Sequence, residues 1–172
     1  MTPPEARHDL PAAFAAALGQ CVADFGWLEE VLKRAIHALE TAPRAPEPGE
    51  AELEAGLVRM DSLADDTLST LIDHLDAAMR RRGGLADRHA IGRALRALRE
   101  DRNLVCHASW QPTVDPDRWH PAFVSHRGEV FAGNLGIAEL RAIAARTREA
   151  GARIVAVMHA AGGRGDWAGD DG

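Results

Sequence analysis

Hydrophobic side chains recur every three or four positions along most of the chain, which is the spacing of a helix that buries one face. The first such stretch begins at Pro11 and ends near Ala42, and the breaker-rich segment Pro43–Gly49 follows it. Its apolar stripe consists of Phe14, Leu18, Cys21, Val22, Phe25, Leu28, Leu32, Ile36 and Leu39. The pattern predicts a long first helix and then a linker.

Three further helices are predicted by the same periodicity. The second carries apolar residues in phase from Leu53 to Met79 and ends at Arg80–Gly84. Basic residues in a last turn, with glycine just beyond it, favour a helix C-terminus. The third helix runs from about Ala86 to Ala108, and the fourth runs from about Gly136 to Ala160.

The segment between the third and fourth predicted helices has a different character. Prolines interrupt it, and two short apolar runs, Ala122–Val124 and Glu129–Phe131, flank His126–Gly128. This arrangement predicts a short β-hairpin. The predicted fold is therefore mainly α, a four-helix bundle with a short β-hairpin inserted before the last helix.

Composition points to one globular domain. The chain has 172 residues, of which 46% are hydrophobic and 27% charged, as in ordinary globular proteins. We expect a single domain over residues 11–160, a flexible N-terminus over residues 1–10 and a disordered Gly/Asp-rich tail over residues 161–172. The polar start and the lack of an apolar run of about 20 residues predict a cytoplasmic protein without a membrane span.

Charge and cysteine content exclude several other classes. A net charge of −6 argues against a protein that coats nucleic acid non-specifically, because that affinity comes mainly from basic residues. The two cysteines, Cys21 and Cys106, make neither a disulfide framework nor a zinc cluster. Both are expected to be small buried residues on helices.

The third predicted helix has an apolar face and a polar face, with one residue out of place. At about 100° per residue, the apolar stripe is Ile91, Leu95, Leu98 and Val105, and the polar stripe is His89, Arg93, Arg96, Glu100, Asn103 and His107. Arg102 falls in phase with the apolar stripe. Burying an unpaired guanidinium is costly, so Arg102 needs either a carboxylate partner or a helix end that opens into a cleft. The candidate partners are Glu29, Glu30 or a carboxylate of a second chain, and a bound phosphate is the alternative.

Arg102 and His107 are the two side chains with the clearest chemical use, but their spacing keeps them apart on an ideal helix. Five positions place them about 140° apart around the axis. They converge only if the helix distorts near Cys106, if the arginine side chain curls round, or if a second copy of the chain completes the site. All three routes are compatible with the sequence.

The run Arg102-Asn103-x-x-x-His107, near the end of a helix in a small bundle, resembles the motif of the HEPN superfamily. The run Phe25-Gly26-Trp27-Leu28-Glu29-Glu30 is similar to the first helix of bacterial HEPN-like proteins. The resemblance covers roughly residues 14–110. Members are typically metal-independent endoribonucleases that act as homodimers, and many are toxins or defence components. Others have lost activity and serve as binding or regulatory modules.

The resemblance implies roles for five residues. His107 would act as an acid or base and Arg102 would stabilise the charge of a phosphorane, while Asn103 would orient the ring or bind a phosphate oxygen. Arg96 and Arg99 would extend the substrate-binding surface. The implied partners are a second copy of the chain, RNA and an antitoxin or regulatory protein, with no cofactor. No metal is expected, because the other histidines lack ligand spacing.

Other interpretations stay open at this point. His107 could cap carbonyls at the helix end or pack against Trp110. The whole chain could be a catalytically silent helical dimer that binds a nucleotide or a protein, or a structural bundle within a larger assembly.

Overall fold

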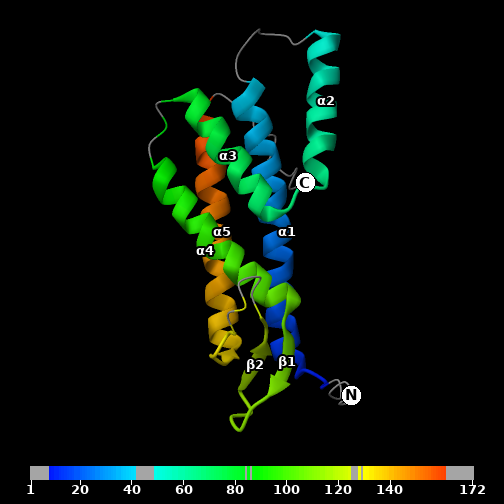
Figure 1. The fold of residues 1–172 in the computed structure, drawn as a ribbon, viewed down its shortest axis with the longest axis vertical. Coiled ribbons are helices and arrows are strands. Elements are labelled where there is room, and N and C mark those ends of the chain that lie inside the picture. Colours follow the sequence, from blue (N-terminus) through cyan, green and yellow to red (C-terminus); the bar gives the residue numbers. More distant parts are fainter. Residues whose placement is uncertain are drawn as a thin grey trace, which may run out of the picture.

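The computed structural model describes residues 8–41, 49–83, 85, 87–124, 128 and 130–161. It contains the helices α1 (Ala12–Thr41), α2 (Glu50–Ala64), α3 (Leu68–Arg82), α4 (Arg88–His107) and α5 (Ile137–Ala160) (Figure 1). The flexible start predicted over residues 1–10, the linker over 43–49 and the disordered tail over 161–172 fall mostly on residues 1–7, 42–48 and 162–172, which lie outside the described residues.

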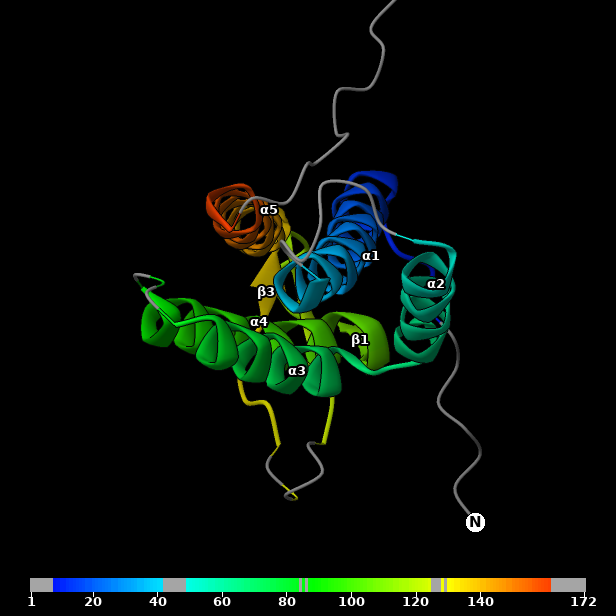
Figure 2. The ribbon, with the colours of Figure 1, turned by 90° about the horizontal axis from the view of Figure 1, so that it is seen from above.

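Four of the helices form a closed bundle, as predicted. Helix α1 packs against α5 and α3, and α4 packs against the other sides of α3 and α5, which closes the ring (Figure 2). Most of the largest fully buried side chains come from these helices, among them Phe25, Leu28, Leu32, Ile36, Leu71, Leu75, Leu95, Leu140 and Ile154. Helix α2 stands outside this ring and packs on α1.

The second predicted helix is wrong in one respect, because it is two helices. Helix α2 ends at Ala64, and the backbone N–H of Asp66 donates to the carbonyl of Leu63 at 3.3 Å in the turn that follows. Thr67 then caps α3, where its Oγ1 accepts a hydrogen bond from the N–H of Thr70 at 3.3 Å. Threonine is a preferred N-cap residue, so a helix start was encoded here. The apolar periodicity continues across the turn and hides it.

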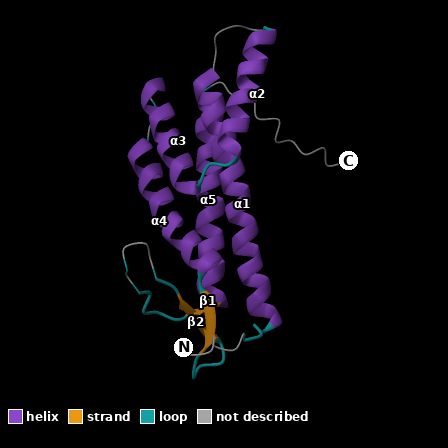
Figure 3. Ribbon diagram, turned by 45° about the vertical axis from the view of Figure 1, so that its right-hand side comes forward, coloured by secondary structure: helices purple, strands orange, loops and turns teal. Residues whose placement is uncertain are grey.

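The β structure before α5 is a three-stranded antiparallel sheet at one end of the bundle (Figure 3). Its strands are β1 (Ser109–Pro112), β2 (Arg118–Ala122) and β3 (Leu135–Gly136), in the order β1-β2-β3. A hairpin before the last helix is thus confirmed, but it is formed by β1 and β2. The predicted strands at 122–124 and 129–131 contribute one isolated bridge, Val124 to Val130, and residues 125–127 lie outside the described part.

Aromatic packing explains why the hairpin forms from residues 109–122, which precede the predicted strands. Trp110 of β1 and Trp119 of β2 both contact Phe14 at the start of α1, with ring centroids 5.2 Å and 5.8 Å apart. Burial of such large rings outweighs the proline content of the strands, which made this segment look irregular. The sheet is therefore anchored to α1.

The same sheet is tied to α5 through Glu139. Its carboxylate accepts hydrogen bonds from the N–H of Gly136 at 3.0 Å and from Nη1 of Arg118 at 2.7 Å. Backbone N–H groups at the start of α5, together with Arg118, hold the pKa of Glu139 below its usual range. The chain that leaves α4 is consequently fixed to both α1 and α5.

Candidate active site at the end of α4

The last turns of α4 bring Arg102 and His107 together. Nη1 of Arg102 lies 3.2 Å from Nε2 of His107. The helix continues to His107, and the N–H of Ala108 still donates to the carbonyl of Leu104 at 3.0 Å. The helix is therefore not distorted at Cys106, and the contact is made within one chain. Of the three routes to convergence, the curled arginine side chain is the one observed.

The contact defines the state of the imidazole ring. A guanidinium has only donors, so Nε2 of His107 must be the acceptor. The ring in this arrangement is neutral and carries its proton on Nδ1. A neutral histidine at an exposed position can take up a proton from a reacting group. Among the described residues the hydrogen bond of the His107 ring is to Arg102 and not to a backbone carbonyl, and the ring contact of Trp110 is with Phe14.

Glu29 on α1 supplies the carboxylate partner that Arg102 requires. Its Oε1 lies 3.6 Å from Nε of Arg102, and the two side chains are 25% and 31% exposed. The pair is half in solvent, which explains how an arginine is tolerated in phase with the apolar stripe of α4. A half-exposed pair of this length contributes little to stability, so its main effect is on the orientation of the guanidinium.

Arg102 retains donors for a ligand after these two contacts. A guanidinium has five N–H groups, of which one faces Glu29 and one faces His107. The remaining three have no partner among the described residues. Planar guanidinium donors match two oxygens of a phosphate, so the site has the groups needed to hold an anion beside the neutral ring of His107.

The two cysteines behave differently from each other. Cys21 is fully buried, as predicted, and its thiol donates to the carbonyl of Leu140 at 3.1 Å. Cys106 is exposed, so the prediction of a buried residue is wrong for it. Partial burial of its sulfur raises the pKa of Cys106, while the charge of Arg102 opposes that shift. Cys106 therefore lies beside the Arg102–His107 pair, close enough to be influenced by the charge of Arg102.

The other predicted site residues are spread along α4. Asn103 is half-buried one turn before His107, and its side chain has no hydrogen-bond partner in the part of the chain described. Arg96 is exposed, and its guanidinium folds back over Gly92. Arg99 donates from Nη2 to Glu100 at 2.7 Å and from Nη1 to Ser69 at 3.4 Å. The structure does not bring Arg96 or Arg99 into contact with the Arg102–His107 pair.

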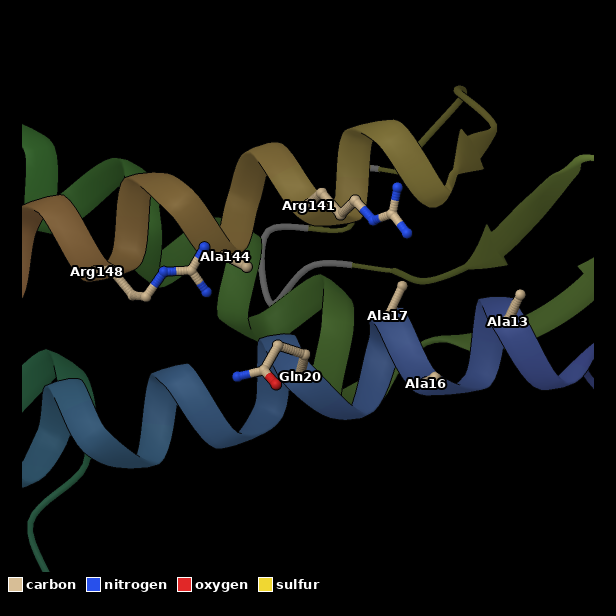
Figure 4. A pocket seen from close by; sticks show the side chains of 7 residues that line it. All are labelled: Ala13, Ala16, Ala17, Gln20, Arg141, Ala144 and Arg148. Carbon is tan, nitrogen blue, oxygen red and sulfur yellow. The ribbon is translucent and has the colours of Figure 1, made fainter.

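A groove elsewhere on the molecule is unrelated to this chemistry. It lies between α1 and α5, has a volume of about 520 Å³ and is lined by Ala13, Ala16, Ala17, Gln20, Arg141, Ala144 and Arg148 (Figure 4). Its Arg148 donates to Asp24 of α1 at 2.8 Å. Neither Arg102 nor His107 lines this groove.

Two further geometric findings concern metals and membranes. No group of three or more His, Cys, Asp or Glu side chains within the described residues is placed to hold a metal ion. None of the helices in the described part of the chain combines the length and the apolar character that a membrane crossing requires.

Comparison of the chain with protein-family models, with curated proteins and with solved structures finds no match.

Proposed function

We propose that the chain is a metal-independent endoribonuclease of the HEPN type that acts as a homodimer, in the role of a toxin or defence component. The observation that carries the proposal is the contact of Arg102 with His107, 3.2 Å from Nη1 to Nε2, at an exposed helix end. The two residues have the order and the spacing of the arginine and the histidine in the HEPN motif. Glu29, which contacts Arg102, belongs to the run in α1 that is similar to the first helix of bacterial HEPN-like proteins.

The chemistry that fits these groups is internal transesterification of RNA. The neutral ring of His107 takes the proton of a 2′-hydroxyl, and the 2′-oxygen then attacks the adjacent phosphorus. The bond between phosphorus and the 5′-oxygen breaks, and that oxygen leaves with a proton. The products are a 2′,3′-cyclic phosphate and a 5′-hydroxyl. Arg102 binds the equatorial oxygens, where negative charge develops, and Asn103 binds a phosphate oxygen or orients the ring.

A second copy of the chain would complete the set of groups. The reaction needs one base and one acid at the same time, and each chain supplies one histidine at this site. In a homodimer His107 would act as the base. The partner subunit's His107, released from its own arginine and protonated to the imidazolium, would give a proton to the leaving oxygen.

The test is RNA cleavage in the presence of EDTA. Wild-type protein is compared with Arg102→Ala and His107→Ala, and with the controls Arg153→Ala and His159→Ala. Arg153 pairs with Glu149 on the surface of α5, and His159 is exposed near its end. We expect cleavage with 2′,3′-cyclic ends by wild type and both controls, and loss of cleavage in the two site variants. All variants must fold and elute as wild type does.

Absence of cleavage by the folded wild-type protein would favour the second candidate function. This is a catalytically silent helical dimer that binds a nucleotide or a protein. It is favoured by the net charge of −6 and by the fact that Arg102 already has a carboxylate neighbour. Equal cleavage by wild type and the site variants would instead show that the activity has another source.

A further inference from the structure

We infer that Arg93 and Arg96 form a phosphate-binding track on α4 that holds a single RNA strand on one side of the Arg102–His107 pair. The substrate class rests on the proposed function. The track itself rests on separate observations of charge and position. It would bind phosphates that flank the scissile one, and it would contribute affinity without taking part in the reaction.

The first observation is the pairing of arginines with carboxylates. Most arginines of the described residues form an ion pair with an Asp or Glu side chain: Arg34, Arg59, Arg80, Arg81, Arg88, Arg99, Arg102, Arg118, Arg146, Arg148 and Arg153. Arg93 and Arg96 are exposed and have no carboxylate within ion-pair distance in the described part of the chain. In a chain of net charge −6, two neighbouring arginines of this kind make a local positive surface. Such a surface is the usual footprint of a polyanion.

The second observation is the alignment of this surface with the site. Arg96 and His107 are eleven positions apart on one unbroken helix. They consequently lie within about 20° of each other around the axis and about 16 Å apart along it. Arg93 lies about one turn further from His107. A strand whose scissile phosphate contacts Arg102 and His107 would meet both arginines if it ran along α4.

Glu100 would repel such a strand, but Arg99 neutralises it. Glu100 lies on the exposed stripe between Arg96 and Asn103, and both Nε and Nη2 of Arg99 donate to its Oε1, at 3.1 Å and 2.7 Å. Arg99 therefore assists the track by cancelling the charge of Glu100. The family resemblance implies that Arg99 itself binds substrate, but in this inference Arg93 has that role instead.

Gly92 leaves space for the side chain of Arg96. A Cβ atom at position 92 would lie 3.3 Å from Nη1 of Arg96, so the guanidinium rests over this residue. Arg141 also lacks a carboxylate partner in the described residues, but it lines the groove between α1 and α5. It is not part of the track.

A single strand suits this geometry better than a duplex. Attack by the 2′-oxygen requires that oxygen to move into line with the leaving 5′-oxygen, and a stacked double helix restricts this movement. Contacts to phosphates along an exposed helix carry no base information, so the track predicts binding with little sequence preference.

The experiment measures RNA binding in the His107→Ala background, where the probe is not consumed. The probe is a fluorescent single-stranded RNA oligonucleotide of mixed sequence. The track variant is Arg93→Gln/Arg96→Gln, and the control is Arg80→Gln/Arg153→Gln, which removes the same charge from two exposed surface arginines. We expect the track variant to bind roughly tenfold more weakly and the control to change less than about twofold. The dependence of log K on log salt should be shallower by about 1.4 in the track variant, because two single-strand phosphate contacts are lost.

The outcomes separate this inference from the proposed function. In proteins that retain His107, the track variant should raise KM and leave kcat unchanged. If the wild type cleaves RNA and the track and control variants bind equally well, the track is wrong and the proposed function stands. If no RNA is cleaved but binding still depends on Arg93 and Arg96, the track stands and the nuclease proposal fails. Absence of RNA binding overturns the track.

Discussion

Glu29 on α1 lies 3.6 Å from Arg102 on α4, measured from Oε1 to Nε, and this contact joins the two segments that resemble the HEPN family. With Nε directed at Glu29, the Nη edge of the guanidinium faces His107. In the proposed reaction Glu29 would thus be a positioning residue, because it would act on the reacting groups through Arg102.

Replacement of Glu29 should therefore impair turnover and leave stability almost unchanged. In Glu29→Gln the neutral amide holds the guanidinium weakly, and we expect kcat for RNA cleavage to fall about tenfold with little change in KM, an energy of about 1.4 kcal/mol. The midpoint of thermal unfolding should stay close to that of wild type, since a half-exposed pair contributes less than about 1 kcal/mol.

Glu30→Gln is the matched control, because Glu30 pairs with Arg34 on the surface of the same helix at 2.7 Å. It loses the same charge at the adjacent position and should cleave RNA as wild type does. An equal loss of kcat in both variants would show that the charge of α1, and not the orientation of Arg102, controls the rate.

A second prediction concerns the shape of the cation at position 102. Arg102→Lys keeps the charge but loses the planar fork that contacts Glu29 and His107 together. We expect kcat to fall roughly 100-fold, which is the scale of losing one aligned donor to a developing charge. Single-turnover cleavage with saturating protein measures this step directly. A lysine variant with nearly full activity would mean that Arg102 acts only as a point charge.

The sequence was sufficient to predict the bundle and three of its helices within about two residues. Each of the helices α1, α4 and α5 has an apolar stripe along its length, broken in α4 only at Arg102, and their ends coincide with breakers or with the start of the sheet. Helices α2 and α3 were merged, because the cap at Thr67 leaves the apolar period intact. The hairpin was displaced, because burial of Trp119 and its contact with Phe14 depend on a helix far away in the chain.

The side chains of the candidate site could be proposed from the sequence, but their geometry could not. The polar stripe identified His107 and Asn103, and the misplaced charge identified Arg102 and its need for a carboxylate. The choice of Glu29 depends on how α1 and α4 cross, and the contact with His107 depends on the length and rotamer of the arginine. Neither can be read from helical periodicity. That Arg93 and Arg96 have no carboxylate partner among the described residues is likewise visible only once those carboxylates are placed.

A third prediction tests the packing of α1 on α5. Helix α5 continues through Gly151, and a Cβ atom at this position would lie 2.2 Å from the ring of Trp27. Gly151→Ala should destabilise the protein by about 1–3 kcal/mol, because the ring must leave its contact. Gly19→Ala on α1 meets nothing within 4 Å, so it should stabilise by about 0.5–1 kcal/mol through helix propensity. Urea unfolding measures the change in the free energy of unfolding, which should have opposite signs in the two variants. Stabilisation by both substitutions would show that Trp27 is not packed on α5.

The last prediction follows from the buried thiol of Cys21. Burial raises the pKa of Cys21 to about 11, and the negative charge of Asp24 adds to the shift. Because the folded state keeps the neutral thiol, the unfolded chain loses this proton at a lower pH. The contribution to stability is complete below the unfolded pKa of about 8.5 and is lost as the pH rises toward 11.

The expected loss is at most about 3 kcal/mol, because the folded and unfolded pKa values differ by about 2.5 and each pKa unit corresponds to about 1.4 kcal/mol. It is measurable here because the chain has no tyrosine and Lys33 is the only lysine, so few other groups titrate in this window. Urea unfolding between pH 8.5 and 11 should show falling stability in wild type and a flatter profile in Cys21→Ala. Cys106→Ala is the comparison variant. The pKa of Cys106 is also raised by partial burial, but its residue is exposed, so this variant should flatten the profile less than Cys21→Ala does. A thiol reagent should modify Cys106 at once and Cys21 only on unfolding, and rapid modification of both would contradict the burial of Cys21.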